Sequence, residues 1–146
     1  NVINLSSNPD AGGKRISRLL EDNKKFTFIP NMDSKDFLSL MKYATFMIGN
    51  SSAGIREAPS FGLPVINIGT RQNGRLRASN VLDVKHDRYE IKKAIQKVLN
   101  DKKFILKMKN LKNPYGDGKA AKRIVKFIEE TKITKQFIQK RIVDVE

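Results

Sequence analysis

The sequence has no cysteine and a single histidine, His86. Without cysteine the chain forms no disulfide bond and offers no thiolate ligand for zinc or an iron–sulfur cluster. One histidine is too few for a metal site that several histidines build. No apolar run approaches the roughly 18 residues that cross a bilayer. Within these 146 residues, the lack of cysteine, of further histidines and of long apolar runs excludes a disulfide scaffold, a zinc finger and a membrane-spanning segment.

The start of the chain also lacks features of an independent or exported protein. Residue 1 is not methionine, and residues 1–5 read directly as a strand. They lack the basic and apolar regions of a signal peptide. We therefore expect a fragment of a longer, cytoplasmic protein that does not contact a membrane.

The chain carries a large excess of positive charge. It has 29 Lys and Arg residues against 15 Asp and Glu, a formal net charge of +14. Such an excess suggests an anionic partner such as nucleic acid, a membrane surface or phosphate groups. Lysine outnumbers arginine, however, and the lysines are spread along the chain as on solvated helix faces. Aromatic residues interleaved with arginines, which would stack on nucleic-acid bases, are not evident. The preferred interpretation of the excess positive charge is thus a solvated surface. A preference for phosphate-bearing ligands comes second, and nucleic-acid binding is the least favoured interpretation.

Short β-branched runs alternate with amphipathic segments along 146 residues, about the length of one domain. The runs predict five strands, at residues 2–5, 26–29, 45–48, 64–68 and 80–84. Helices are expected at residues 12–23, from 33 or 34 onward, and at 53–61 (disturbed by Pro59), 87–99, 101–110 and 118–130. Strands separated by helices of about ten residues predict a parallel sheet with right-handed crossovers. The fold class is therefore α/β, a doubly wound Rossmann-like domain over residues 1–130.

Residues 131–146 form an extension that can continue the last helix. It carries four apolar residues at intervals, Ile133, Phe137, Ile138 and Ile142. Such a stripe needs a partner surface. If no sheet face is free, we expect it to dock on a missing domain or a second subunit.

The strongest local signal for chemistry is the segment from Gly49 to Ala58, which follows a strand and opens a helix. Ligands of parallel sheets bind outside the carboxyl ends of the strands. Small residues admit a ligand to the backbone, free N–H groups at a helix start suit a phosphate, and Ser51 and Ser52 add hydroxyl donors. The alternative is an ordinary serine N-cap. Glu57, further along, can accept hydrogen bonds from ribose hydroxyls or simply be solvated or salt-bridged.

Three further loops and the histidine hold candidate residues, each with a structural alternative. In residues 8–14, Asp10 can cap a helix and Gly12 permits close backbone approach, although the spacing fits neither a Walker A loop nor GxGxxG. The loop from Gly69 to Arg77 holds Arg71, Arg75 and Arg77, which bind phosphate bidentately or are solvated. The segment 113–119 can close over a ligand, or Asp117 can cap the next helix. His86 is more readily a loop residue than a catalytic base.

The residues from Gly49 to Arg75 closely resemble the UDP-N-acetylglucosamine 2-epimerases. The run Gly69-Thr70-Arg71-Gln72-Asn73-Gly74-Arg75 resembles the hydrolysing, sialic-acid-pathway branch in particular. Asn8-Pro9-Asp10-Ala11-Gly12-Gly13 and Asn113-Pro114-Tyr115-Gly116-Asp117-Gly118 match further family segments in the same order, so the resemblance extends to about residue 130. In the first of these, Pro9 departs from the residue that relatives often carry before the aspartate.

The resemblance implies the C-terminal half of a GT-B enzyme, in which two Rossmann-like halves face each other across a cleft. This half would hold UDP, with uracil near residues 28–30. By resemblance, Ser51 and Ser52 meet the diphosphate and Glu57 meets the ribose. Asn8, Asp10 and Gly12 would line the cleft, and Arg71 and Arg75 would border the nucleotide or hold its loop.

The reaction implied by the resemblance is elimination of UDP from UDP-N-acetylglucosamine to a glycal, then hydration to free N-acetylmannosamine. A related branch acts on a diacetamido-trideoxy sugar in legionaminic acid synthesis. The family's acid/base carboxylates and an active-site histidine lie mainly on the N-terminal half, so the resemblance implies no catalytic residue here and little activity for the isolated chain. It implies no cofactor and no metal, and it implies a homo-oligomeric full-length enzyme.

Two alternatives remain open. A basic Rossmann-like module would bind nucleic acid through its lysine-rich helices, with an affinity that falls steeply with salt. A glycosyltransferase C-terminal half would share the donor site, although the Gly69–Arg75 segment argues against it.

Overall fold

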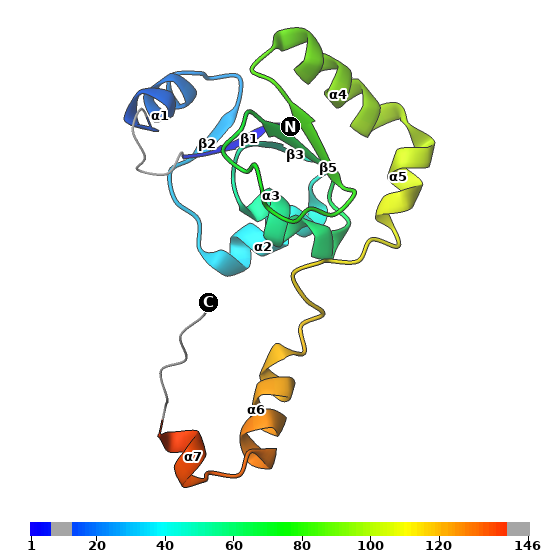
Figure 1. The fold of residues 1–146 in the computed structure, drawn as a ribbon. Helices are drawn as coiled ribbons and strands as arrows, with labels where there is room; N and C mark the ends of the chain where they lie inside the picture. The colour runs from blue at the N-terminus through cyan, green and yellow to red at the C-terminus, as the bar shows by residue number, and fades with distance from the viewer. Residues whose placement is uncertain (7–12, 140–146) are drawn as a thin grey trace, which may run out of the picture.

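The computed structural model describes residues 1–6 and 13–139. Strands and helices alternate along the chain as far as β4, and a loop without a helix then leads to β5 (Figure 1). The strands are β1 (Ile3–Leu5), β2 (Thr27–Ile29), β3 (Met47–Gly49), β4 (Val65–Ile68) and β5 (Val81–Val84). The helices are α1 (Gly13–Glu21), α2 (Ser34–Tyr43), α3 (Ala53–Arg56), the 3₁₀ turn η1 (Ala58–Phe61), α4 (Arg88–Asn100), α5 (Lys102–Met108), α6 (Ala120–Glu130) and α7 (Lys135–Ile138). Every predicted strand is found in place, and the α/β class is confirmed.

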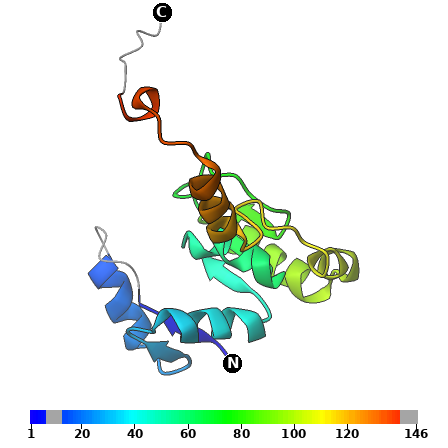
Figure 2. The ribbon, with the colours of Figure 1, turned by 90° about the horizontal axis from the view of Figure 1, so that it is seen from below.

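All strand pairs are parallel, but hydrogen bonding divides the strands into two sheets instead of the single sheet expected. β1 pairs with β2, while β4 lies between β3 and β5. β1, β2 and β3 are each three residues long. Figure 2 shows β1, α1 and α2 gathered at the N-terminal side of the molecule.

The two faces of the β3–β4–β5 sheet are covered by different helices. On one face Ile66 packs with Ala94 and Val98 of α4 and with Phe104 and Met108 of α5. On the other, Val65 packs with Met41 of α2 and Ala58 of η1. Adjacent residues of β4 thus enter opposite layers, because strand side chains alternate between faces. This arrangement, helices on both sides of a parallel sheet, is the doubly wound pattern that the sequence predicts.

Local sequence signals account for most helix boundaries. Asp33 is the N-cap of α2, and its carboxylate accepts hydrogen bonds from the N–H groups of Lys35 and Asp36. Pro59 removes a backbone donor, and the helix expected over 53–61 accordingly splits into α3 and the 3₁₀ turn η1. Gly62 ends that turn with a φ of 60°, the left-handed conformation that glycine adopts most readily.

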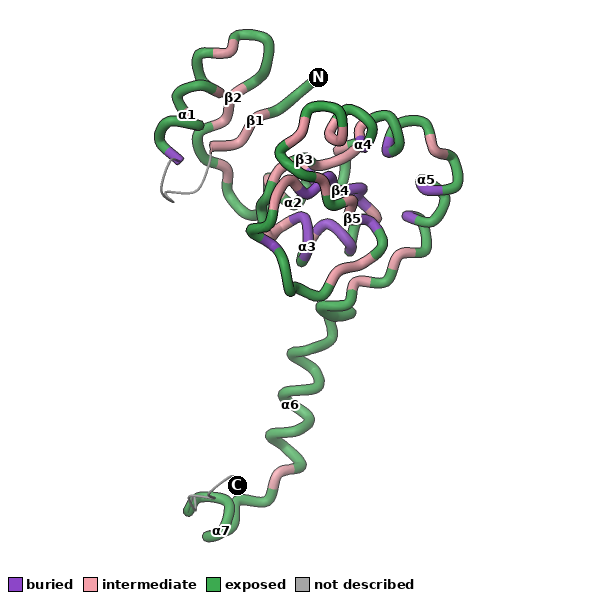
Figure 3. Tube along the Cα trace, turned by 45° about the horizontal axis from the view of Figure 1, so that its top comes forward, coloured by how far each residue is buried: buried purple, intermediate pink, exposed green. Residues whose placement is uncertain are grey.

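The C-terminal helices project from the sheet-containing body (Figures 1 and 3). The expectation that residues 131–146 continue the last helix is wrong for residues 131–134. Thr131 has an extended backbone, and its hydroxyl donates to the Phe127 carbonyl at 2.5 Å. Thr134 then caps the separate short helix α7. The large apolar side chains of this region are exposed, namely Ile124, Val125, Phe127, Ile128, Ile133, Phe137 and Ile138.

Within the described ranges, no helix is long and apolar enough to cross a membrane.

Candidate functional site at the carboxyl ends of β3 and β4

Two loops leave the same edge of the sheet. β3 and β4 are adjacent and parallel, with Gly49 opposite Asn67, so their carboxyl ends lie side by side. The turn 49–52, called the serine turn below, begins at Gly49, the last residue of β3, and the loop 69–77 follows β4. This is the edge at which parallel α/β sheets bind ligands. The tertiary structure thus brings together two segments that the sequence separates.

The two serines of the turn do not act alike. The Ser51 hydroxyl accepts a hydrogen bond from the Ala53 N–H at 3.3 Å. Ser52 occupies the N-cap position of α3, yet its side chain makes no capping hydrogen bond. Among the described residues, the N–H groups of Ser51 and Ser52 also have no acceptor. For Ser52, therefore, the N-cap interpretation is wrong, and the turn presents a hydroxyl and two N–H donors that no other described residue uses.

Glu57 presents an acceptor to which none of the described residues donates. It is the C-cap residue of α3, and its Oε2 atom is buried with no hydrogen-bond partner among the described residues. A buried carboxylate oxygen without a donor is costly, and natural structures usually supply one from a neighbour, water or ligand. The alternatives of a solvated or salt-bridged Glu57 are not what the structure shows for this oxygen.

The three arginines of the 69–77 loop have different environments. The Arg71 guanidinium donates to the Asn50 carbonyl at 3.3 Å, which places it beside the turn 49–52. Arg77 forms an ion pair with Asp83 and donates to the Gln72 carbonyl at 2.6 Å, so it is committed within the fold. The Arg75 side chain is exposed and makes no hydrogen bond or ion pair to another described residue. Of the predicted pair, the structure brings Arg71 to the serine turn but gives Arg75 no contact there.

The residues 113–118 join the elements around this edge. Asn113 donates to the Arg56 carbonyl at 2.8 Å and to the Ser60 hydroxyl at 2.7 Å. The Tyr115 hydroxyl donates to the Leu76 carbonyl at 3.0 Å, which ties the segment to the end of the 69–77 loop. Asp117 is not the N-cap of α6. Instead it accepts from the Lys119 N–H and pairs with Arg123.

Asp117 has the one strongly displaced carboxyl pKa among the described residues. The hydrogen bonds from the Arg123 guanidinium and from the Lys119 N–H lower the pKa of Asp117 from 3.8 to about 2. Both interactions favour the charged carboxylate. Both side chains of the pair are exposed, and the ion pair joins the segment before α6 to the first turn of that helix.

Three predicted site residues, Asn8, Asp10 and Gly12, lie outside the described residues. The expected uracil position at residues 28–30 covers the end of β2 and the residue after it, in the two-stranded sheet. His86 is exposed, and its ring lies against Gly69, where an added Cβ would come within 2.3 Å of the ring. Within the described ranges no hydrogen bond joins His86 to the serine turn, in keeping with a loop residue.

Sequence reasoning missed Gln72, Asn67 and Asn80, which are the buried polar residues of the described core. Gln72 stands among polar neighbours in a loop, where only its contacts distinguish it. Asn67 interrupts the apolar run of β4, and that interruption was a signal in the sequence. Asn80 donates to the Leu63 carbonyl at 2.8 Å and so holds the entries of β4 and β5 together.

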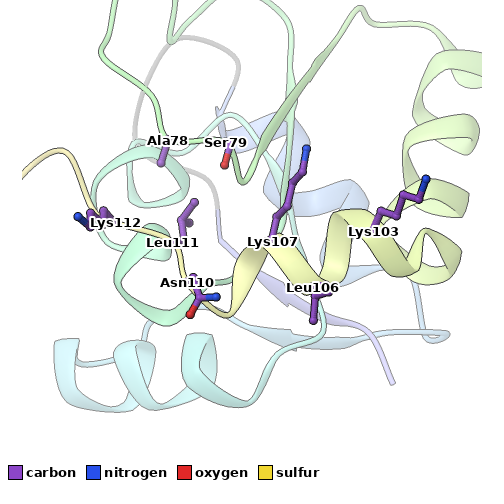
Figure 4. Close-up of a pocket in the computed structure, with 8 residues that line it drawn as sticks. All are labelled: Ala78, Ser79, Lys103, Leu106, Lys107, Asn110, Leu111 and Lys112. Atoms are coloured by element: carbon purple, nitrogen blue, oxygen red, sulfur yellow. The ribbon is translucent and has the colours of Figure 1, made fainter.

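Two hollows in the described part of the chain adjoin the other edge of the sheet. One of about 710 Å³ lies between α5 and residues 78–79, and lysines line it beside Leu106 and Leu111 (Figure 4). A smaller one of about 310 Å³ lies at the entries of β3 and β4. Both adjoin residues that precede strands, whereas the serine turn and the arginine loop follow them.

The chemistry of the edge is that of anion and diol recognition. Ser51, Ser52 and Arg71 supply donors, and Glu57 supplies a carboxylate acceptor. Among residues 1–6 and 13–139, no group of three or more His, Asp or Glu side chains could hold a metal ion. The described lysines are all exposed, and many of them lie on helices. Asp87 and Asp101 accept from backbone N–H groups as N-caps of α4 and α5.

The fold belongs to the class of Rossmann-like α/β domains found in GT-B-type enzymes. The crystal structure of UDP-GlcNAc 2-epimerase from Neisseria meningitidis, bound to UDP-GlcNAc, is similar with a TM-score of 0.67 and 25% sequence identity. The similarity covers 87% of this chain and 36% of that one. A family model described as UDP-N-acetylglucosamine 2-epimerase matches residues 1–129. The chain belongs to the UDP-N-acetylglucosamine 2-epimerase family.

Curated relatives support the same family assignment. The polysialic acid biosynthesis protein P7 of Escherichia coli is 35% identical over 145 residues, which cover 97% of this chain and 35% of that protein. The UDP-N,N'-diacetylbacillosamine 2-epimerase (hydrolyzing) of Legionella pneumophila is 33% identical over 142 residues, which cover 95% of this chain and 36% of that protein. The chain spans about a third of the length of these relatives.

Proposed function

We propose that this chain is the UDP-binding, C-terminal half of a hydrolysing UDP-N-acetylglucosamine 2-epimerase. The full enzyme would release UDP and form N-acetylmannosamine for sialic-acid-type sugars. Family membership supports the epimerase reaction, and the resemblance of residues 69–75 supports the hydrolysing branch. The Legionella relative, whose name specifies a diacetylbacillosamine substrate, supports a second candidate: the corresponding UDP-diacetamido-trideoxy sugar.

The observation that carries the proposal is the set of unused polar groups at one edge of the sheet. The turn after β3 offers the Ser52 hydroxyl and the Ser51 and Ser52 N–H groups, with Arg71 beside it. These donors suit a diphosphate. Glu57 offers a buried carboxylate oxygen without a donor, which suits a ribose hydroxyl. A nucleoside diphosphate would satisfy both sets at once.

In the proposed reaction this half stabilises the leaving group. A base on the other half removes the C2 proton of the sugar, the C1–O bond breaks, and its electron pair leaves with UDP to give the glycal. Water then adds across the double bond, its proton to C2 and its hydroxyl to C1. Donors fixed around the diphosphate favour the first step because negative charge develops on UDP as the bond breaks.

The acid and base groups are proposed to lie on the N-terminal half, so this chain alone should have little or no epimerase activity. The exposed apolar side chains of α6 and α7 support a partner surface, either that half or a second subunit. In this proposal residues 1–130 are the nucleotide-binding domain and residues 131–146 an extension that reaches the partner.

Calorimetric titration of the chain with UDP tests the proposal. We expect saturable binding, with CMP and ADP binding more weakly. Ser52→Ala and Glu57→Gln should each weaken UDP binding about tenfold, as expected for loss of a hydrogen bond to a charged or buried partner. The matched controls are Ser39→Ala on α2 and Glu129→Gln on α6, which are exposed and far along the chain from this edge.

Two results would overturn the proposal. UDP affinity unchanged in both site variants would remove these residues from the site. Equal binding of a random oligonucleotide, falling steeply with salt, would instead favour the nucleic-acid module.

A further inference from the structure

Gln72 is buried within a loop whose neighbouring side chains are exposed. Its exposed fraction is 2%, while Arg71 and Asn73 on either side are exposed. A primary amide is costly to bury, so its environment must make use of it. Its Nε2 atom donates to the Asn50 carbonyl at 2.7 Å, and its Oε1 atom is buried with no partner among the described residues. The donor is therefore the part of Gln72 that the fold uses.

The hydrogen bond from Gln72 determines the orientation of a peptide in the serine turn. In a planar trans peptide the carbonyl and the following N–H point to opposite sides. Gln72 and Arg71 hold the Asn50 carbonyl toward the 69–77 loop. The Ser51 N–H, on the same peptide, is consequently directed away from that loop. It is one of the donors without an acceptor among the described residues.

Gln72 is itself fixed in place by hydrogen bonds that connect it to residues of the sheet. Arg77 donates through one guanidinium nitrogen to the Gln72 carbonyl at 2.6 Å and through the other to Asp83. The second oxygen of Asp83 accepts from Asn67 at 2.7 Å, and Asn67 is 1% exposed in the central strand. A continuous series of hydrogen bonds thus runs from β4 and β5, through the 69–77 loop, to the turn after β3.

We propose that Gln72 is a positioning residue for the diphosphate part of the nucleotide site, with Arg77 as its support. The inference rests on the proposed function. Gln72 touches no ligand in this scheme; its carboxamide orients the Asn50–Ser51 peptide so that the Ser51 N–H faces the phosphates. Arg77 uses both ends of its planar guanidinium, a geometry that lysine does not reproduce.

The test is Gln72→Met, with binding of UDP and of uridine measured by NMR titration of the full chain. Methionine keeps the volume but removes the donor to Asn50, and it also removes the unpaired buried oxygen. The two changes oppose each other in stability, so the free energy of unfolding should change little. We expect the dissociation constant for UDP to rise about tenfold and that for uridine to change less than about twofold. Uridine lacks the phosphates that the oriented N–H would contact.

The controls separate this inference from the function on which it rests. Gln96→Met, an exposed glutamine of α4, should alter neither constant. Arg77→Lys should show the same selective loss for UDP as Gln72→Met. If Ser52→Ala weakens UDP binding and Gln72→Met does not, or if uridine and UDP weaken equally, the positioning role is overturned and the site stands. If the unmodified chain does not bind UDP, the proposed function itself fails.

Discussion

Replacing Gly62 with alanine tests how η1 packs against α5. Gly62 has a φ of 60° and a ψ of 25° at the end of η1. A Cβ added there would lie 2.5 Å from the backbone oxygen of Met108 and 3.2 Å from its carbonyl carbon. The crowded atoms belong to the backbone of α5, so no side-chain rotation relieves the contact. Met108 is also a member of the core layer on that face of the sheet.

The expected loss of stability has two parts. The left-handed conformation costs an L-residue about 1–2 kcal/mol. Forcing a methyl group into a packed position costs about 1–3 kcal/mol more. The sum is about 2–5 kcal/mol, a large part of the roughly 5–15 kcal/mol that stabilises a typical protein. At about 2–4 °C per kcal/mol, the melting temperature should fall by roughly 4–20 °C.

Gly74→Ala is the matched control. Gly74 has a φ of 76°, but an added Cβ would meet no atom within 4 Å. It therefore carries the conformational cost without the crowding. Chemical unfolding followed by circular dichroism, with linear extrapolation to water, gives the two free energies of unfolding. We expect Gly62→Ala to lose about 1–3 kcal/mol more than Gly74→Ala. Equal losses in the two variants would refute the contact between Gly62 and α5.

Two further predictions concern the C-terminal helices. Because the pKa of Asp117 is lowered from 3.8 to about 2 in the folded chain, the stability its charge contributes to the start of α6 is complete above pH 3.8 and is lost as the pH falls through about 2. A carboxyl NMR titration should give a midpoint near that lower value, and a midpoint near 3.8 would contradict the pairing with Arg123. Phe127→Ser together with Ile128→Ser should reduce self-association of the chain in sedimentation, since both side chains are exposed. Unchanged association, with Leu106→Ser as the control at another exposed apolar position, would show that the α6 face is not what drives it.

The positions of the strands and of most helices follow from short-range patterns. Short apolar runs locate β3, β4 and β5, and the run is most continuous in β4, the central strand, because its first three residues are buried. Asp33 determines a helix start through hydrogen bonds to residues two and three positions away, and Pro59 determines a helix break because it lacks a backbone N–H. The break at residues 131–134 was missed, since the apolar spacing of the tail continues across it.

The candidate site was accessible to sequence reasoning only in part. The serine turn and the three arginines could be singled out, because their residue types suit phosphate and they follow strands. The separate roles of these residues could not be predicted from the sequence. Arg71 and Arg77 are six positions apart in one polar loop, yet one lies at the serine turn and the other is committed to Asp83. Nothing in the loop's composition distinguishes them.

The sequence by itself determined the α/β class, the order of the elements and the family, because these depend on local periodicity and on residue motifs. Only the tertiary structure decided that the strands form two sheets, that Ser52 is not used as a cap, and that Gln72 is buried against Asn50. The physical reason is that hydrogen-bond partners far apart in the sequence are chosen by where parallel strands end in space. That choice depends on the packing of the whole sheet, which no single segment specifies.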